Sequence, residues 1–133
     1  PDHPSCRTTD GRFLLPCSVS HDDRFAVAVA ADRRVGVDVE KASARLLKSR
    51  SLYMSAAEQV LSRESGLGEI EAAVRIWSIK EAAAKALDIT LAAAWHRVGV
   101  YDIGAFESRF QIDGQGTYTA VHDAVGQHVF TLM

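Results

Sequence analysis

The chain has 133 residues, a formal net charge of −2 at pH 7, and hydrophobic and charged fractions of 47% and 24%. These values are typical of one globular domain, with or without a short arm, and they exclude disordered and fibrous proteins. A near-neutral chain also argues against nucleic acid as the main partner. The longest apolar run, 25–31, is too short to cross a membrane, and no signal-peptide pattern begins the sequence.

The N-terminal residues predict an arm and a short extended piece. Residues 1–16 hold all three prolines and show little periodicity, which favours an arm or a loop. Residues 17–20 are extended and lead to His21, and residues 22–23 form a turn. We therefore expect the domain proper to span residues 17–133.

The two cysteines, Cys6 and Cys17, lack the spacing and the neighbouring histidines of a zinc site. They leave two alternatives, one disulfide or two reduced thiols, and the second suits the cytoplasm, where we expect the protein. The sequence begins with Pro1 instead of Met, so we expect either a processed chain or a segment of a larger protein.

Two apolar stretches, 24–30 and 35–40, predict strands, and the tight connection between them predicts an antiparallel hairpin. Alternation along the second strand places Asp38 and Glu40 on the same face. Two like charges held this close need an offset, either from solvent at a strand end or from a divalent cation. Neighbouring carboxylates suit a hard ion such as Mg²⁺.

The middle of the chain predicts two helices. Ser55 and Glu58 have the spacing of a capping box, which predicts a helix over about 56–64. A longer helix over 69–87 contains neither glycine nor proline and is rich in alanine.

The C-terminal third predicts a strand meander after an unassigned segment around Trp95. Four runs of strand-forming residues are separated by turn signals. The expected strands are 97–103, 106–112, 117–122 and 128–132. The fold class is therefore α+β, an antiparallel β-sheet packed against helices on one side.

One face of the long helix carries a carboxylate where an apolar side chain is expected. Four-residue spacing stacks Trp77, Glu81 and Lys85, and Lys80 lies on the flank. Two interpretations stay open. Glu81 and Lys85 form an ordinary ion pair on a solvated face, or Glu81 lies at the rim of a cleft whose lysines hold an anion.

Three motifs, taken together and in this order, resemble the 4′-phosphopantetheinyl transferase superfamily. They are Ser18-Val19-Ser20-His21, Gly36-Val37-Asp38-Val39-Glu40, and Trp77-Ser78-Ile79-Lys80-Glu81 followed by Lys85. Their order is similar to that of the Sfp type, and the resemblance covers roughly residues 11–90.

The resemblance implies a reaction in which the phosphopantetheine arm of coenzyme A moves to a serine of a carrier protein. Adenosine 3′,5′-bisphosphate would leave. Asp38, Glu40 and Glu81 would hold Mg²⁺, or Mn²⁺, together with the diphosphate of coenzyme A. Asp38, Glu81 and Lys85 would be catalytic, and Glu81 would also accept the serine proton. Trp77 would be a packing residue that turns Glu81 towards the metal.

The resemblance also implies contacts with coenzyme A, the co-substrate. Ser20 and His21 would bind its 3′-phosphate. Lys80 and Lys85 would lie against the other phosphates, and Arg12 would lie near the adenosine.

Three basic residues, Lys41, Arg45 and Lys48, recur at helical spacing beside the acidic strand. The carrier proteins of this superfamily are acidic, so these side chains would dock an acyl or peptidyl carrier protein. A solvated charged face is the alternative.

Two features depart from the family pattern. Asp22 and Asp23 follow His21, and acidic side chains beside a phosphate are unfavourable unless they turn away. Sfp-type chains also have two similar lobes, and this chain is too short for both, so residues 1–16 are either an arm or the remnant of a preceding lobe. The site would then be completed by an absent N-terminal portion, by self-association, or by the rest of a larger synthase.

Two other classes of function stay open. One is a metal-dependent phosphohydrolase that uses the same three carboxylates. The other is a non-catalytic lobe that works only inside a larger assembly.

Overall fold

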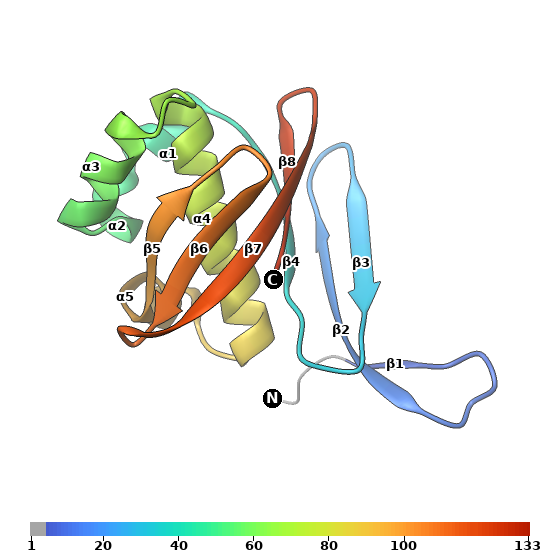
Figure 1. Ribbon diagram of the computed structural model, residues 1–133. Coiled ribbons are helices and arrows are strands. Elements are labelled where there is room, and N and C mark those ends of the chain that lie inside the picture. Colours follow the sequence, from blue (N-terminus) through green and yellow to red (C-terminus); the bar gives the residue numbers. More distant parts are fainter. Residues whose placement is uncertain (1–4) are drawn as a thin grey trace.

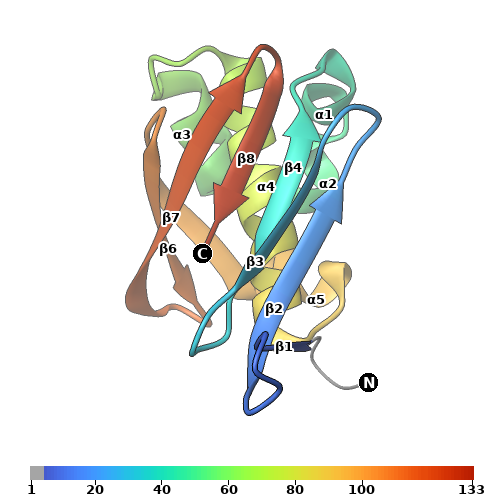
Figure 2. The same ribbon diagram turned by 90° about the vertical axis from the view of Figure 1, so that its right-hand side faces the viewer.

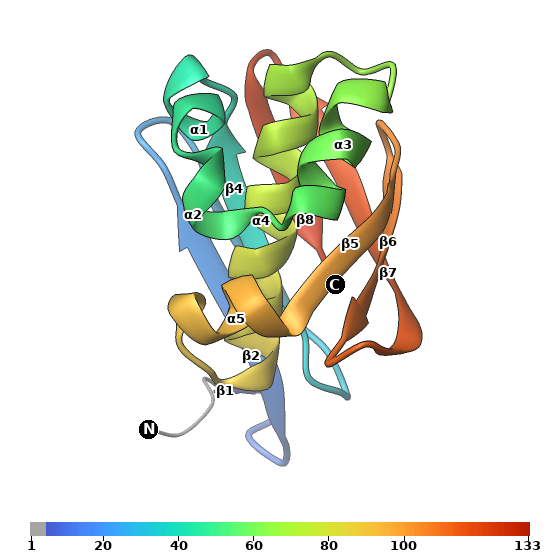
Figure 3. The same cartoon turned by 90° about the vertical axis from the view of Figure 1, so that its left-hand side faces the viewer.

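The computed structural model describes residues 5–133, which form two antiparallel sheets and a layer of helices (Figure 1). The larger sheet contains β4 (Val37–Lys41), β5 (Val98–Ile103), β6 (Glu107–Ile112), β7 (Gln115–Val125) and β8 (His128–Leu132), in the order β4-β8-β7-β6-β5. The smaller contains β1 (Ser5–Arg7), β2 (Leu14–His21) and β3 (Ala26–Ala30). Figure 3 looks onto the helices that cover one face of the larger sheet, which confirms the predicted α+β class.

The helices are α1 (Ala44–Lys48), α2 (Arg50–Tyr53), α3 (Ala56–Glu64), α4 (Glu69–Leu87) and α5 (Leu91–Arg97). The long helix α4 has the predicted bounds. The capping box is also confirmed, because Ser55 accepts a hydrogen bond from Glu58 N and the Glu58 side chain accepts one from Ser55 N. The unassigned segment around Trp95 is α5. Of the helices in residues 5–133, none has the length and apolar character that a membrane span requires.

Helix α4 lies across the larger sheet, and small residues bring the two layers close together. Ile76 and Ile79 are fully buried and belong to the same core cluster as Phe110. A Cβ atom built on Gly36 would lie 1.8 Å from the carbonyl oxygen of Ala82. The approach of the segment before β4 to α4 therefore requires glycine at position 36.

The predicted hairpin between strands 24–30 and 35–40 is wrong. β3 pairs with β2, and β4 pairs with β8. Figure 2 shows β4 between β8 and the β2–β3 hairpin. Gly36 exchanges two main-chain hydrogen bonds with Met133, so the C-terminal strand occupies one edge of β4, and the other edge faces β2.

The expected N-terminal arm is a hairpin where the structure describes it. Residues 5–7 pair with residues 14–16, so both are strands rather than loop. Residues 1–4 of the arm lie outside the described residues. The domain boundary expected at residue 17 falls inside β2. Cys6 and Cys17 are free thiols.

Side chains, rather than a main-chain ladder, join the β2–β3 hairpin to the larger sheet. Ser18 Oγ accepts a hydrogen bond from Val37 N at 3.0 Å, and Ser20 Oγ accepts one from Val39 N at 3.1 Å. These bonds satisfy donors on the edge of β4 that faces β2. They also place the first sequence motif directly against the second.

Candidate active site

The carboxylate of Asp38 is the point at which the three motifs meet. It is 3% exposed. Ser78 Oγ donates to its Oδ2 at 2.8 Å, and Ser20 Oγ donates to its Oδ1 at 3.2 Å. Lys85 Nζ lies 3.6 Å from Oδ1. Burial raises the pKa of Asp38, and the charge of Lys85 and the serine hydroxyls oppose this shift.

Glu40 extends from the same strand and is held by the indole of the long helix. Trp77 Nε1 donates a hydrogen bond to Glu40 Oε1 at 3.0 Å. Burial, followed by the charge of Asp38, raises the pKa of Glu40. Trp77 was predicted only to be a packing residue, so this hydrogen bond was not predicted.

Glu81 shares the electrostatic environment of the two strand carboxylates. Burial, followed by the charge of Asp38, raises the pKa of Glu81 to about 7, and Glu40 adds to the effect while Lys85 opposes it. Asp38 therefore destabilises the charged forms of Glu40 and Glu81, and Glu40 destabilises that of Glu81. A divalent cation would offset this repulsion, and carboxylate oxygens are ligands that Mg²⁺ accepts. The chemistry of the donors Asp38, Glu40 and Glu81 thus fits the implied metal, although in the described residues their ligand oxygens do not all lie within 4.8 Å of one another.

A tighter acidic group lies elsewhere. Within residues 5–133, the ligand atoms of Asp22, Asp23 and His128 lie within 4.8 Å of one another, and no such group contains Asp38 or Glu81. This group is already bonded internally, because His128 Nδ1 lies 2.6 Å from Asp22 Oδ2.

Asp22 is a structural residue of the β2–β3 turn. Its Oδ1 accepts hydrogen bonds from Arg24 N and Phe25 N. Burial acts to raise the pKa of Asp22, but these bonds and the contact with His128 outweigh it and lower the pKa to about 2. The side chain that departs from the family pattern is therefore engaged with β8.

Lys85 reaches from α4 towards β2. Its Nζ donates to Val37 O at 2.9 Å and to Val19 O at 3.2 Å. About a third of its side chain is exposed. This lysine therefore links the helix to both strands that carry the other motifs, while part of it faces solvent.

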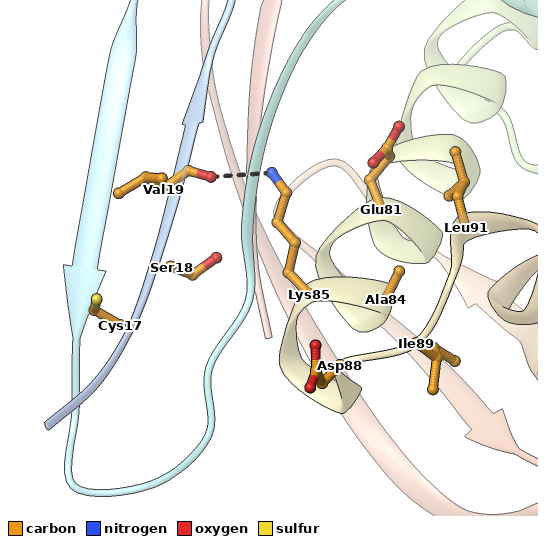
Figure 4. Close-up of a pocket in the computed structure, with 9 residues that line it drawn as sticks. All are labelled: Cys17, Ser18, Val19, Glu81, Ala84, Lys85, Asp88, Ile89 and Leu91. Carbon is orange, nitrogen blue, oxygen red and sulfur yellow. Dashed lines mark hydrogen bonds between the residues drawn. The ribbon is translucent and has the colours of Figure 1, made fainter. Parts of the chain in front are cut away.

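A cleft of about 440 Å³ opens beside this lysine (Figure 4). Glu81 and Lys85 lie on its α4 side, and Ser18 and Val19 lie on its β2 side. Its other lining residues are Cys17, Ala84, Asp88, Ile89 and Leu91. The first and third motifs therefore share one open, largely apolar cleft that is lined by the carboxylates of Glu81 and Asp88 and by the ammonium group of Lys85.

Lys80 is not a phosphate ligand, and that prediction is wrong. Its side chain is fully buried. Nζ donates to Glu58 Oε1 at 2.8 Å, to Tyr53 O at 2.6 Å and to Trp95 O at 3.0 Å. An ammonium group has three donors, so none is left for a ligand. Burial lowers the pKa of Lys80, and Glu58 opposes this shift.

Arg12 and His21 are exposed, and neither lines the cleft. Arg12 lies in the connection between β1 and β2, which projects from the rest of the molecule (Figure 1). His21 is the last residue of β2. Their contacts with coenzyme A stay predictions, as does that of Ser20, whose hydroxyl already bonds Asp38 and Val39 N.

Lys41, Arg45 and Lys48 are all exposed. Lys41 ends β4, so only the other two lie on a helix, α1. The charge of Arg45 lowers the pKa of Glu40, which places Arg45 near the carboxylates.

The sequence did not lead us to predict two contacts: the hydrogen bond from Ser78 to Asp38, and that from Lys80 to Glu58. Ser78 lies inside the third motif, and a serine in an alanine-rich buried segment is a signal for a buried acceptor. Glu58 was recognised only as a cap.

The sequence model of the 4′-phosphopantetheinyl transferase superfamily matches residues 34–132. This range contains the acidic strand, the motif of the long helix and the strands that follow Trp95, and it begins after Ser18–His21. No curated protein matches the chain. The family match covers about three quarters of the sequence, and the chain belongs to the 4′-phosphopantetheinyl transferase superfamily.

Proposed function

We propose that this protein transfers the 4′-phosphopantetheine group of coenzyme A to a serine of an acyl or peptidyl carrier protein, in a reaction that requires Mg²⁺. One observation carries the proposal. Residues of all three motifs converge on the buried carboxylate of Asp38, with Ser20, Ser78 and Lys85 around it. Family membership supports phosphopantetheinyl transfer in general.

Glu81 and Lys85, which line the cleft, and the strand residues Asp38 and Glu40, which do not, together suit phosphoryl transfer. In this reaction the serine hydroxyl attacks the phosphorus that bears the pantetheine arm, and the bond from that phosphorus to adenosine 3′,5′-bisphosphate breaks. Mg²⁺ held by Asp38, Glu40 and Glu81 would neutralise charge on the diphosphate oxygens. Lys85, which reaches from α4 towards β2, would add a second positive charge in the cleft.

Glu81 is the group that would take the serine proton. Without a cation, burial and the charge of Asp38 raise the pKa of Glu81 to about 7. A bound Mg²⁺ would lower this pKa, so Glu81 would act as a weak base, directly or through a water molecule. Glu81 lines the cleft together with Lys85, so the proton acceptor and the lysine ammonium group both come from the α4 side of the cleft.

The carrier would dock on Lys41, Arg45 and Lys48. All three are exposed, and two of them form one side of the short helix α1 that follows β4. An acidic partner at this surface would approach the same end of β4 that carries Glu40.

We also propose that a second surface completes the coenzyme A site, from another copy of the chain or from a neighbouring lobe. The residues predicted to bind the adenosine end, Arg12 and His21, lie outside the cleft. A separate apolar groove of about 300 Å³ includes Val27 and Val29 of β3 and Val121 of β7, and Val121 is 47% exposed. Light scattering across a concentration series would test self-association.

The decisive experiment incubates the full chain with coenzyme A, Mg²⁺ and a panel of apo carrier proteins, and it follows the carrier mass. We expect a gain of one phosphopantetheine group, and we expect Glu81→Gln to abolish it. Hydrolysis of simple phosphate esters without carrier modification would instead favour the phosphohydrolase. Failure to bind either coenzyme A or Mg²⁺ would favour the non-catalytic lobe.

A further inference from the structure

The indole of Trp77 joins the long helix to the acidic strand through one hydrogen bond. Its Nε1 donates to Glu40 Oε1 at 3.0 Å. Glu81 lies one turn further along the same face of α4. The helix thus presents a donor to the strand carboxylate and a carboxylate of its own at successive turns.

The ring of Trp77 is itself fixed by its neighbours. Tyr53 packs edge-on at 5.1 Å between ring centroids, and Trp95 packs at 6.1 Å with a tilt of 45°. The buried Lys80 donates to the main-chain carbonyls of both neighbours. The indole N–H therefore points at Glu40 from a rigid aromatic cluster.

Without the bond from Trp77, Glu40 would have no side-chain hydrogen bond to another described residue. It is the residue before the exposed end of β4, and its long side chain has several rotamers. Hydrogen bonds from Ser20 and Ser78 hold Asp38, whereas for Glu40 the contact in residues 5–133 is with Trp77. A donor on one oxygen fixes the orientation of the other oxygen.

We propose that Trp77 is a positioning residue that binds one oxygen of Glu40 and so directs the other towards the cation shared with Asp38 and Glu81. This inference rests on the proposed function, because it requires a cation at those carboxylates. Residues that orient a metal ligand typically change metal affinity by about 10-fold to 100-fold when they are replaced.

The test measures Mn²⁺ binding by electron paramagnetic resonance in the full chain without a carrier protein. Position 77 is replaced by benzothienylalanine, which keeps the shape of tryptophan and lacks the N–H, and separately by Trp77→Phe. We expect about 10-fold weaker Mn²⁺ binding in both. In the transferase assay, we expect a matching rise in the metal concentration for half-maximal rate, with kcat at saturating metal within about twofold.

The chain offers a matched control in Trp95. Its Nε1 is buried, and it has no hydrogen-bond partner among the described residues. Trp95→Phe keeps an aromatic ring against Trp77 and leaves the Trp77–Glu40 hydrogen bond in place, so Mn²⁺ binding should weaken clearly less than in Trp77→Phe. Equal weakening in Trp95→Phe would overturn the proposal, because packing alone would then explain the effect.

Failure of this inference and failure of the proposed function give different results. If Asp38→Asn and Glu40→Gln lose Mn²⁺ while both Trp77 replacements bind it normally, the positioning role is refuted and the metal site stands. If Asp38→Asn and Glu40→Gln bind Mn²⁺ normally, both are refuted. In a Trp77→Phe/Glu40→Gln double variant, a loss no larger than that of Glu40→Gln alone would support the coupling.

Discussion

Lys80 and Glu58 form an ion pair inside the core, with 2.8 Å between Nζ and Oε1. Glu58 Oε1 also accepts from Ser55 N, and Oε2 accepts from Val100 N at 2.9 Å. One carboxylate therefore ties the start of α3 to α4 and to β5. A buried charge is tolerated only when it is paired and fully hydrogen-bonded, and both conditions hold here.

Removal of the ammonium group should destabilise the protein strongly. Lys80→Met leaves the charge of Glu58 buried without its cation, which typically costs about 3–5 kcal/mol of unfolding free energy. Urea denaturation followed by circular dichroism measures the change. The double variant Lys80→Met/Glu58→Gln should recover part of the loss. A normal unfolding free energy combined with lost coenzyme A binding would restore Lys80 as a ligand.

The contact between Gly36 and Ala82 predicts a steric effect on the site. In Gly36→Ala the new methyl group meets main-chain atoms of α4 and cannot move aside. β4 must then shift away from the helix, at a cost of about 1–3 kcal/mol or more. Because β4 carries Asp38 and Glu40, we also expect weaker Mg²⁺ binding.

Gly99 is the matched control for this substitution. It lies in β5, and a Cβ atom there would meet nothing within 4 Å. Gly99→Ala should leave both the melting temperature and Mg²⁺ affinity nearly unchanged. Equal stability of Gly36→Ala and Gly99→Ala would show that the close approach to α4 has no energetic role.

The raised pKa of Glu81 predicts how stability depends on pH in metal-free protein. Its pKa is about 7 in the folded state and 4.5 as the ordinary value. Between these values the folded protein keeps a proton that the unfolded chain has lost, so this group's contribution to stability falls as pH rises through the window. Glu81→Gln removes this contribution. From pH 5 to pH 8 in EDTA, the stability of the unmodified protein should fall by about 1–2 kcal/mol relative to the variant, after discounting for solvent screening.

Added Mg²⁺ provides the check on this prediction. A cation bound at the carboxylates would raise the stability of the unmodified protein most at pH 8, where Glu81 is ionised, and it would raise that of Glu81→Gln less. The structure indicates that Glu81 is partly shielded from water. If the unfolding free energies of the two proteins in EDTA changed in parallel with pH, this shielding would be contradicted.

Local sequence patterns predicted the positions of helices and strands well, but they predicted poorly which strands pair with one another. The absence of glycine and proline defined α4, and the spacing of Ser55 and Glu58 defined the start of α3, because both signals act within a few residues. Strand pairing depends on which edges meet in the folded chain. Nothing near Gly36 in the sequence indicates that Met133, almost a hundred residues away, would take its hydrogen bonds.

The site shows the same division between local and distant information. Alternation along the strand placed Asp38 and Glu40 correctly relative to one another, and helical spacing related Glu81 to Lys85. The helical period alone cannot tell which flank of α4 faces the core, so Lys80 and Lys85 were both predicted to lie against the phosphates. One is fully buried, and the other lines the cleft.

The basic surface gives the last prediction, which concerns the carrier protein. Charge reversal at Lys48 should raise the KM for the carrier by roughly twofold to fivefold, as expected for a solvent-exposed ion pair, and the effect should diminish at high salt. Affinity for coenzyme A should not change.

Arg45 is less suitable alone, because its charge also lowers the pKa of Glu40, so Arg45→Glu should weaken Mg²⁺ binding as well. Arg63→Glu, exposed on α3, is the matched control and should behave as the unmodified protein. Steady-state kinetics with each substrate varied in turn separates these effects, and an equal loss towards coenzyme A and the carrier in Lys48→Glu would rule out a docking role.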